Sequence, residues 1–190
     1  MSRLYLVRHG PTHVKRLIGW TDVPADLSDT AALTRLSNAL PEDAIVVSSD
    51  LLRARSTGDA IAADRERLPH RHELREIHMG DWEDRTWQDV DAAYGSALRQ
   101  YYEQPGDAAP PNGESWNALS TRVWKTVLEL SSQHPALVIV AHMGPILSLV
   151  QRAKGIDAYA ALGHQIDPLS LTTFDLSQGR LALEGLNQLP

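Results

Sequence analysis

"ALVIVAH", Ala136 to His142, is the stretch that decides the fold class. Its residues up to Ala141 are apolar without polar alternation, which is typical of a strand buried on both faces of a parallel sheet. Leu4 to Val7 and Ile45 to Val47 are shorter runs of the same kind. We therefore expect three buried strands of one parallel sheet.

Helical periodicity fills the chain between these strands. Helices are expected over residues 28–40, 52–63, 86–102, 114–133 and 144–154. Strand and helix thus alternate, which predicts an α/β fold of three layers, with a mostly parallel central sheet and helices on both faces. The segments "LSLTTFDL" and "RLALEGL" alternate in polarity and predict a carboxy-terminal hairpin that turns at residues 177–179.

Length and composition narrow the class of protein. At 190 residues the chain is long enough for one core and short for two, so we expect a single domain over residues 1–190. The formal net charge of -6 argues against a nucleic-acid or anionic-membrane surface. The absence of cysteine excludes thiolate zinc sites and cysteine nucleophiles. No segment resembles a signal peptide or a membrane helix, so we expect a cytoplasmic protein without membrane contact.

Nitrogen-rich side chains follow the predicted strands where each strand ends. The first strand runs into Arg8, His9 and Gly10, the second is followed by Arg53 in the next helix, and the third ends at His142. Ligands of open α/β sheets bind beyond the carboxyl ends of the strands, and arginine beside a helix amino terminus favours phosphate. A neutral imidazole held through its other nitrogen can attack phosphorus, so we assign that role to His9. Gly10 would let the backbone approach the phosphate closely.

Six short motifs extend this pattern over most of the chain. They are "LVRHGPT" (Leu6 to Thr12), "GWTD" (Gly19 to Asp22), "SSDLLRARST" (Ser48 to Thr57), "LREIHMGDWED" (Leu74 to Asp84), "NGES" (Asn112 to Ser115) and "VIVAHMG" (Val138 to Gly144). In this order they resemble the histidine phosphatase superfamily, also called the phosphoglycerate-mutase-like family. The resemblance implies that family's fold, with a small helical cap over about residues 74–116.

The resemblance also implies catalytic roles. His9 would be phosphorylated, Arg8, Arg53 and His142 would hold the transferring phosphoryl group, and Glu76 would donate the proton. Nearby Glu73, Asp81 and Glu83 compete with Glu76 as the acid, and Arg55 competes with Arg53, but the motifs favour Glu76 and Arg53. This chemistry needs neither a metal nor a cofactor.

Further positions inside the motifs are expected to contact the substrate. They are Gly10, Thr12, Lys15, Gly19, Trp20, Trp82, Trp116, Met143 and Gly144. Lys15 stands where many family members have a phosphate-binding asparagine, so it either binds phosphate as a point charge or faces solvent. The three tryptophans either form an aromatic mouth that stacks a flat group of the substrate or pack in the core. "HRH" at His70 to His72 has metal-ligand spacing on a strand, but no cysteine and no constellation of carboxylates is tied to it, so a solvated strand is the expected structure.

The chain lacks the insertion that family mutases carry in the region of the acid, so we expect a phosphomonoesterase acting on a small phosphorylated metabolite. The "GWTDVP" and "NGES" segments resemble α-ribazole phosphatases as well as broad-specificity members. A phosphoglycerate mutase primed by bisphosphoglycerate, a phosphatase acting on protein phosphohistidine or phosphoserine, and a binding module without turnover stay open as alternatives. Many members are dimers, so a homodimer is the assembly that the resemblance favours.

Overall fold

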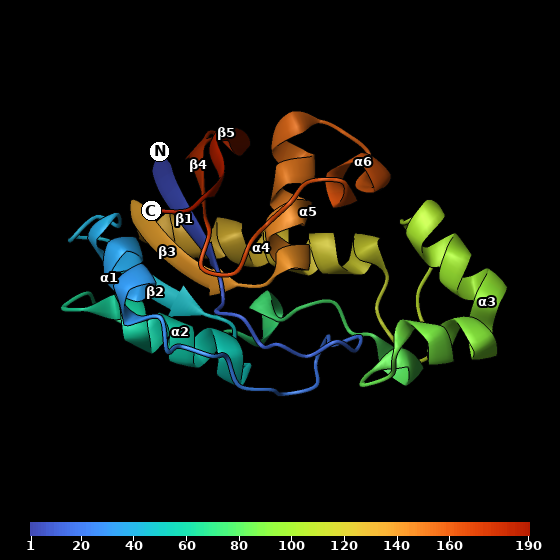
Figure 1. Ribbon diagram of the computed structural model, residues 1–190. Helices are drawn as coiled ribbons and strands as arrows, with labels where there is room; N and C mark the ends of the chain where they lie inside the picture. The colour runs from blue at the N-terminus through green and yellow to red at the C-terminus, as the bar shows by residue number, and fades with distance from the viewer.

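A computed structural model describes all residues of the chain, 1–190. Its centre is one five-stranded sheet in the order β2-β3-β1-β4-β5 (Figure 1). The strands are β1 (Ser2–Arg8), β2 (Ile45–Ser48), β3 (Ala136–Ala141), β4 (Leu171–Ser177) and β5 (Arg180–Gln188). β3 pairs in parallel with both β1 and β2, as predicted, whereas β4 pairs antiparallel with β1 and forms the expected antiparallel hairpin with β5. The sheet is therefore mixed, with its parallel part at β2-β3-β1.

The register brings the ends of the parallel strands into one row. Arg8 of β1 lies opposite Ala141 of β3, and Ser48 of β2 lies opposite Val140. Side chains that follow these three strands must therefore emerge at the same edge of the sheet.

Helices cover both faces of the sheet. On one face α1 (Thr30–Asn38) and α2 (Leu52–Ala62) pack on β-strand residues that include Val138 and Val140. On the other face α4 (Trp116–Gln133) and α5 (Met143–Lys154) pack on residues that include Leu137 and Ile139. Alternate residues of β3 thus enter two different cores, which explains why its sequence lacks polar positions.

α3 (Trp87–Glu103) stands apart from the sheet, beyond α4 (Figure 1). Thr86 caps it by accepting a hydrogen bond from the backbone N–H of Asp89. Its apolar side chains Val90, Leu98 and Tyr101 nevertheless belong to the same core as α4 and α5. The predicted cap is therefore packed against the body of the protein, and α3 can form one wall of a cavity between the two.

The expected elements are confirmed, with local differences. α1 is capped by Asp29 in place of Ser28. The short helices η1 (His72–Leu74), η2 (Gly80–Trp82) and α6 (Ala158–Leu162) have no counterpart in the sequence-based prediction, because each is too short to show periodicity. "HRH" forms no strand: Arg71 makes one isolated bridge with Ser49, and His72 begins η1. None of the helices combines the length and the apolar character required to cross a membrane.

Candidate active site

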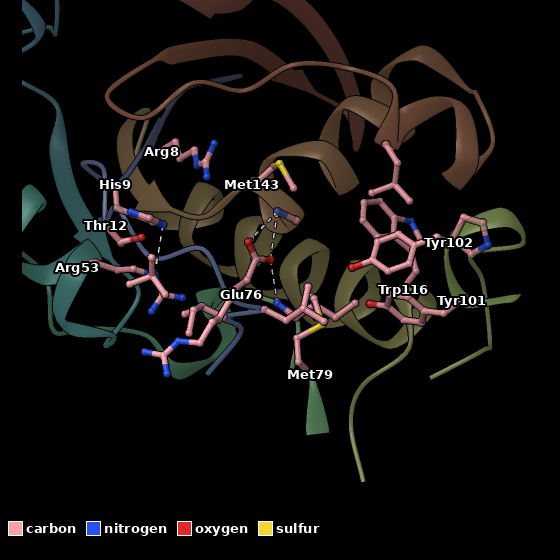
Figure 2. Close-up of a pocket in the computed structure, with 18 residues that line it drawn as sticks. Arg8, His9, Thr12, Arg53, Glu76, Met79, Tyr101, Tyr102, Trp116 and Met143 are labelled. Atoms are coloured by element: carbon pink, nitrogen blue, oxygen red, sulfur yellow. Dashed lines mark hydrogen bonds between the residues drawn. The ribbon is translucent and has the colours of Figure 1, made fainter. Parts of the chain in front are cut away.

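A cavity of about 260 Å³ opens at the carboxyl ends of the parallel strands (Figure 2). Of the residues that the sequence assigned to the site, those that line it are Arg8, His9, Thr12, Arg53, Glu76, Trp116, Met143 and Gly144. They come from β1, α2, α4, α5 and the connecting loops, so the cavity joins segments that are far apart in the chain.

His9 is buried at the floor of this cavity, with 6% of its surface exposed. Its Nδ1 lies 2.7 Å from the carbonyl oxygen of Gly10, so Nδ1 carries the proton and donates. Its Nε2 then carries the lone pair and accepts a hydrogen bond from Nε of Arg53 at 3.3 Å. Burial, helped by the positive charges of Arg53 and Arg8, lowers the pKa of His9 to about 3. At neutral pH the ring is therefore an uncharged nucleophile whose lone pair has a fixed direction.

Two arginines flank His9. The Nη atoms of Arg53 donate to the carbonyl oxygens of Thr21 and Gly19, at 3.0 and 2.6 Å. Arg8 donates through Nη1 to the carbonyl oxygen of Ile166, and its Nε is buried without a hydrogen-bond partner. Burial lowers the pKa of both guanidinium groups, but arginine stays charged at physiological pH. The floor of the cavity thus carries two positive charges.

Glu76 is the carboxylate that lines the cavity. Its oxygens accept hydrogen bonds from the backbone N–H of Gly144, at 3.1 and 3.2 Å, and Oε1 accepts one from Ile77 at 2.9 Å. Gly144 lies in the first turn of α5, where the helix dipole favours a carboxylate. A Cβ atom at Gly144 would overlap Oε1 of Glu76, so the glycine is needed for this close approach.

Two of the competing acids, Glu83 and Asp81, form hydrogen bonds with other groups and do not line the cavity. Glu83 accepts hydrogen bonds from the N–H groups of Gly19, Trp20, Thr21 and Met79 and from the hydroxyl of Thr21. Burial alone would raise the pKa of this carboxyl, but these donors outweigh burial and lower the pKa. Asp81 binds the amide of Asn112. Sequence reasoning treated Glu83 only as a rival acid and missed its structural position between two loops of the site.

Arg122 and Glu114 together hold the loop that carries Glu76, a role that sequence reasoning missed. They make a bidentate ion pair with two N–O distances of 2.7 Å. Arg122 also donates to the carbonyl oxygens of Glu73, Arg75 and Glu76, at 2.8, 2.8 and 2.9 Å. The pair therefore holds the backbone that carries Glu76. The "NGES" motif contains Glu114, but no local signal in the sequence names its partner.

His142 lies behind the cavity wall. It is fully buried, its ring centroid is 5.0 Å from that of His9, and both of its nitrogens lack a hydrogen-bond partner. Burial, with the charges of neighbouring Arg53 and Arg8 acting in the same direction, lowers the pKa of His142 well below its ordinary value. The ring is therefore neutral and offers one N–H donor next to His9.

The remaining assigned positions do not line the cavity. Gly10 donates its N–H to Thr57, and a Cβ there would crowd Leu27, so packing requires this glycine. Gly19 is buried against the backbone of Ile77, and Lys15 is exposed.

Of the three tryptophans that could form an aromatic mouth or pack in the core, one lines the cavity and two do not. Trp82 is fully buried and packs edge-on against Tyr101, at 5.3 Å between ring centroids, so it is a core residue. Trp20 lies under the guanidinium of Arg75 and donates its indole N–H to the carbonyl of Glu76. Trp116 alone among the three lines the cavity.

Tyr101 and Tyr102 of α3 line the cavity beside Trp116, whereas Trp20 and Trp82 do not. Sequence reasoning missed both, because their direction depends on how α3 packs. Burial raises the pKa of Tyr102 to about 12 and also raises that of Tyr101, so both hydroxyls stay protonated and can donate hydrogen bonds.

The structure contains no group of three or more histidine, cysteine, aspartate or glutamate side chains that could hold a metal ion. In the "HRH" segment, His70 shares a hydrogen bond with the hydroxyl of Ser48, whereas His72 lies 3.9 Å from Asp50. The two imidazoles therefore do not converge on one point.

Residues 4–189, nearly the whole chain, match one known family. The family model of the histidine phosphatase superfamily, branch 1, matches residues 4–189. The chain is 31% identical over 198 residues to an adenosylcobalamin/alpha-ribazole phosphatase of Escherichia coli strain K12, covering 97% of this chain and 95% of the relative. It is 35% identical over 185 residues to a glucosyl-3-phosphoglycerate phosphatase of Mycolicibacterium vanbaalenii, covering 86% and 80%. In fold it resembles YhfR of Bacillus stearothermophilus, with a TM-score of 0.91 at 24% identity over 100% of this chain and 98% of the other.

Proposed function

This chain belongs to the histidine phosphatase superfamily and is an enzyme of the phosphatase class, and we propose that it hydrolyses a small phosphate monoester through a phosphohistidine on His9, without a metal. The observation that carries the proposal is the state of His9. Its ring is neutral, its Nδ1–H is held by a carbonyl, and its Nε2 lone pair lies beside two guanidinium groups. A nucleophile in that state is suited to attack on a phosphoryl group.

The proposed reaction has two displacements. In the first, Nε2 of His9 bonds to phosphorus, the ester P–O bond breaks, and Glu76 gives its proton to the leaving oxygen. In the second, water attacks the phosphohistidine, Glu76 takes the proton of that water, and the P–N bond breaks to release phosphate. Arg8 and Arg53 stabilise the charge on the equatorial oxygens in both steps.

We propose a metabolite as the substrate, with α-ribazole 5'-phosphate as the named candidate. The E. coli relative carries that activity in its name and matches nearly the full length of this chain. The cavity volume of about 260 Å³ supports a small ester, because ligand pockets commonly enclose roughly 300–1,000 Å³. A mutase acting on phosphoglycerate would need a further cation for the substrate carboxylate. Arg16, the other arginine on the wall, is engaged by Asp84 at 3.2 and 3.3 Å, which weakens that alternative.

Phosphate release from a panel of monoesters, with chelator present, tests this function. The panel should contain an aryl phosphate, α-ribazole 5'-phosphate, glucosyl-3-phosphoglycerate, and 3-phosphoglycerate with and without bisphosphoglycerate. We expect chelator-resistant turnover by the wild-type enzyme and none by His9→Ala, together with acid-labile labelling of the wild-type protein by a ³²P substrate.

The matched control is His134→Ala, which removes a histidine at the far end of α4 and should leave turnover intact. Turnover that survives in His9→Ala, or that requires a metal, would overturn the proposed mechanism. Conversion of 3-phosphoglycerate to its isomer without phosphate release would instead identify a mutase.

A further inference from the structure

The cavity has two chemically different ends, and Figure 2 shows them on opposite sides of Glu76. At one end lie Arg8, His9 and Arg53, with their charges and hydrogen-bonding groups. At the other end lie Tyr101, Tyr102 and Trp116, all drawn on the same side of the cavity. The polar end fits a phosphoryl group, so the aromatic end must face the rest of the substrate.

In-line displacement fixes which part of the substrate faces the aromatic end. The nucleophile, phosphorus and leaving oxygen lie roughly on one line in phosphoryl transfer. The leaving alcohol therefore points away from His9, past Glu76, which must reach the leaving oxygen to protonate it. Continued in that direction, the alcohol meets the side chains of α3 and the start of α4 (Figure 2).

The side chains of the aromatic end are already packed against neighbouring residues without a substrate. Tyr102 packs between Trp87 and Tyr101, with ring centroids 4.9 and 5.0 Å apart. Trp116 is 4% exposed, and its indole N–H donates to Oε1 of Gln151 at 2.6 Å. Because this donor is already used, Trp116 offers the cavity ring surface and no polar group. A preformed aromatic wall binds a flat apolar group without first losing side-chain entropy.

Apart from the hydroxyls of Tyr101 and Tyr102, the walls beyond the phosphate end offer the alcohol few polar groups. Beside the phosphate end, the walls around Glu76 include Ile18, Ile77, Met79 and Met143. Arg16 pairs with Asp84, so a second anionic group on the substrate would have to compete with that carboxylate for the guanidinium. An alcohol rich in hydroxyls or carrying a carboxylate would lose its hydration here without full replacement.

We propose that the substrates of this enzyme are phosphate monoesters whose alcohol carries an apolar ring system, which packs between Tyr101, Tyr102 and Trp116. Phosphorylated polyols, simple sugars and hydroxy acids are disfavoured. This inference rests on the proposed phosphatase function and specifies the substrate class of the same cavity. The ring would bind at the aromatic end, and phosphoryl transfer would take place at the opposite end. Substrate preference and hydrolysis can therefore be tested separately.

The test compares three esters of primary alcohols with similarly poor leaving groups: benzyl phosphate, ethyl phosphate and glycerol 1-phosphate. We expect kcat/KM for benzyl phosphate to exceed that for the other two by about tenfold or more, from burial of the ring. Tyr102→Leu should reduce this preference to about a third or less, whereas Tyr102→Phe should retain it because the ring remains. Tyr159→Leu, which alters an exposed tyrosine on α6, is the matched control and should behave as wild type.

Calorimetric binding of benzylphosphonate and ethylphosphonate keeps the inference testable without turnover, since phosphonates bind but cannot be hydrolysed. We expect benzylphosphonate to bind about tenfold more tightly, and Tyr102→Leu to remove most of the difference. Equal affinities, or a preference that Tyr102→Leu leaves unchanged, would overturn the inferred substrate class even if all three esters are hydrolysed. Failure to hydrolyse any ester, with the phosphonate preference intact, would count against the proposed function only.

Discussion

Two buried histidines, one in the cavity and one behind its wall, are kept neutral by their surroundings. His9 and His142 are neutral because burial opposes their protonation and because Arg8 and Arg53 lie beside them. A protonated His9 could not attack phosphorus, so the arginines that bind the phosphoryl group also protect the nucleophile from protonation. The same arrangement makes the folded state sensitive to acid.

Stability should therefore fall as the pH is lowered through the window between about 6.5 and about 3, where the unfolded chain protonates His9 and the folded chain does not. From pH 7 to pH 5, His9 alone should remove about 2 kcal/mol from the free energy of unfolding. Urea denaturation of the wild type and of His9→Asn at both pH values checks this. The pH-dependent loss should be smaller in the variant by about that amount, and equal losses in the two proteins would contradict the assigned protonation state.

At the scale of elements, the half-buried carboxylate of Glu83 connects loops that form the site. Glu83, at the end of η2, binds the backbone of residues 19–21, and carbonyl oxygens of that loop in turn receive the guanidinium of Arg53. Arg53 contacts His9. A chain of hydrogen bonds thus runs from the cap region to the nucleophile, so we regard Glu83 as a positioning residue.

Glu83→Gln should disturb this chain, because an amide group replaces one acceptor oxygen with a donor that faces backbone N–H groups. We expect kcat/KM for benzyl and ethyl phosphate to fall together by about tenfold, since the change affects Arg53 and not the aromatic wall. The pKa of His9, followed by NMR, should rise as Arg53 moves away. Asp81→Asn, on the exposed side of η2, is the matched control. A loss of stability with unchanged catalysis and an unchanged His9 pKa would reduce Glu83 to a purely structural role.

Elements differ in how far their sequence predicts them. β3 could be predicted because both of its faces are buried, and Thr86 and Ser115 mark the starts of α3 and α4 with side chains that cap them. The positions of Arg8, His9 and Arg53 followed from strand ends, which always meet at one edge of a parallel sheet. Tyr101, Tyr102 and Arg122 could not be predicted, because their directions depend on how a cap helix and a long helix pack against distant segments. For the same reason the sequence could not decide which of Trp20, Trp82 and Trp116 form an aromatic mouth and which pack in the core: only Trp116 lines the cavity.

At the scale of the whole molecule, the cavity joins segments that are far apart in the chain. Arg8 ends β1 and is held by the carbonyl of Ile166, which precedes β4, whereas Arg53 belongs to α2 and Glu76 contacts α5. The site lies where β1 and β3 meet, between the helices of the two faces. An anion held by both arginines would therefore link elements from both ends of the chain.

Inorganic phosphate should accordingly stabilise the entire fold and not only one loop. A ligand that binds only the folded state adds about 2.7 kcal/mol to the free energy of unfolding when its free concentration is about a hundred times its Kd. For a chain of this size each kcal/mol raises Tm by about 2–4 °C, so an increase of roughly 5–10 °C is expected, measured by calorimetry against chloride at equal ionic strength. Arg53→Ala should lose most of this increase, because it removes one of the two charges on the cavity floor. Arg180→Ala, which removes an exposed arginine from the carboxy-terminal hairpin, should keep it. An increase that persists in Arg53→Ala would mean that phosphate stabilises the protein from a site other than this cavity.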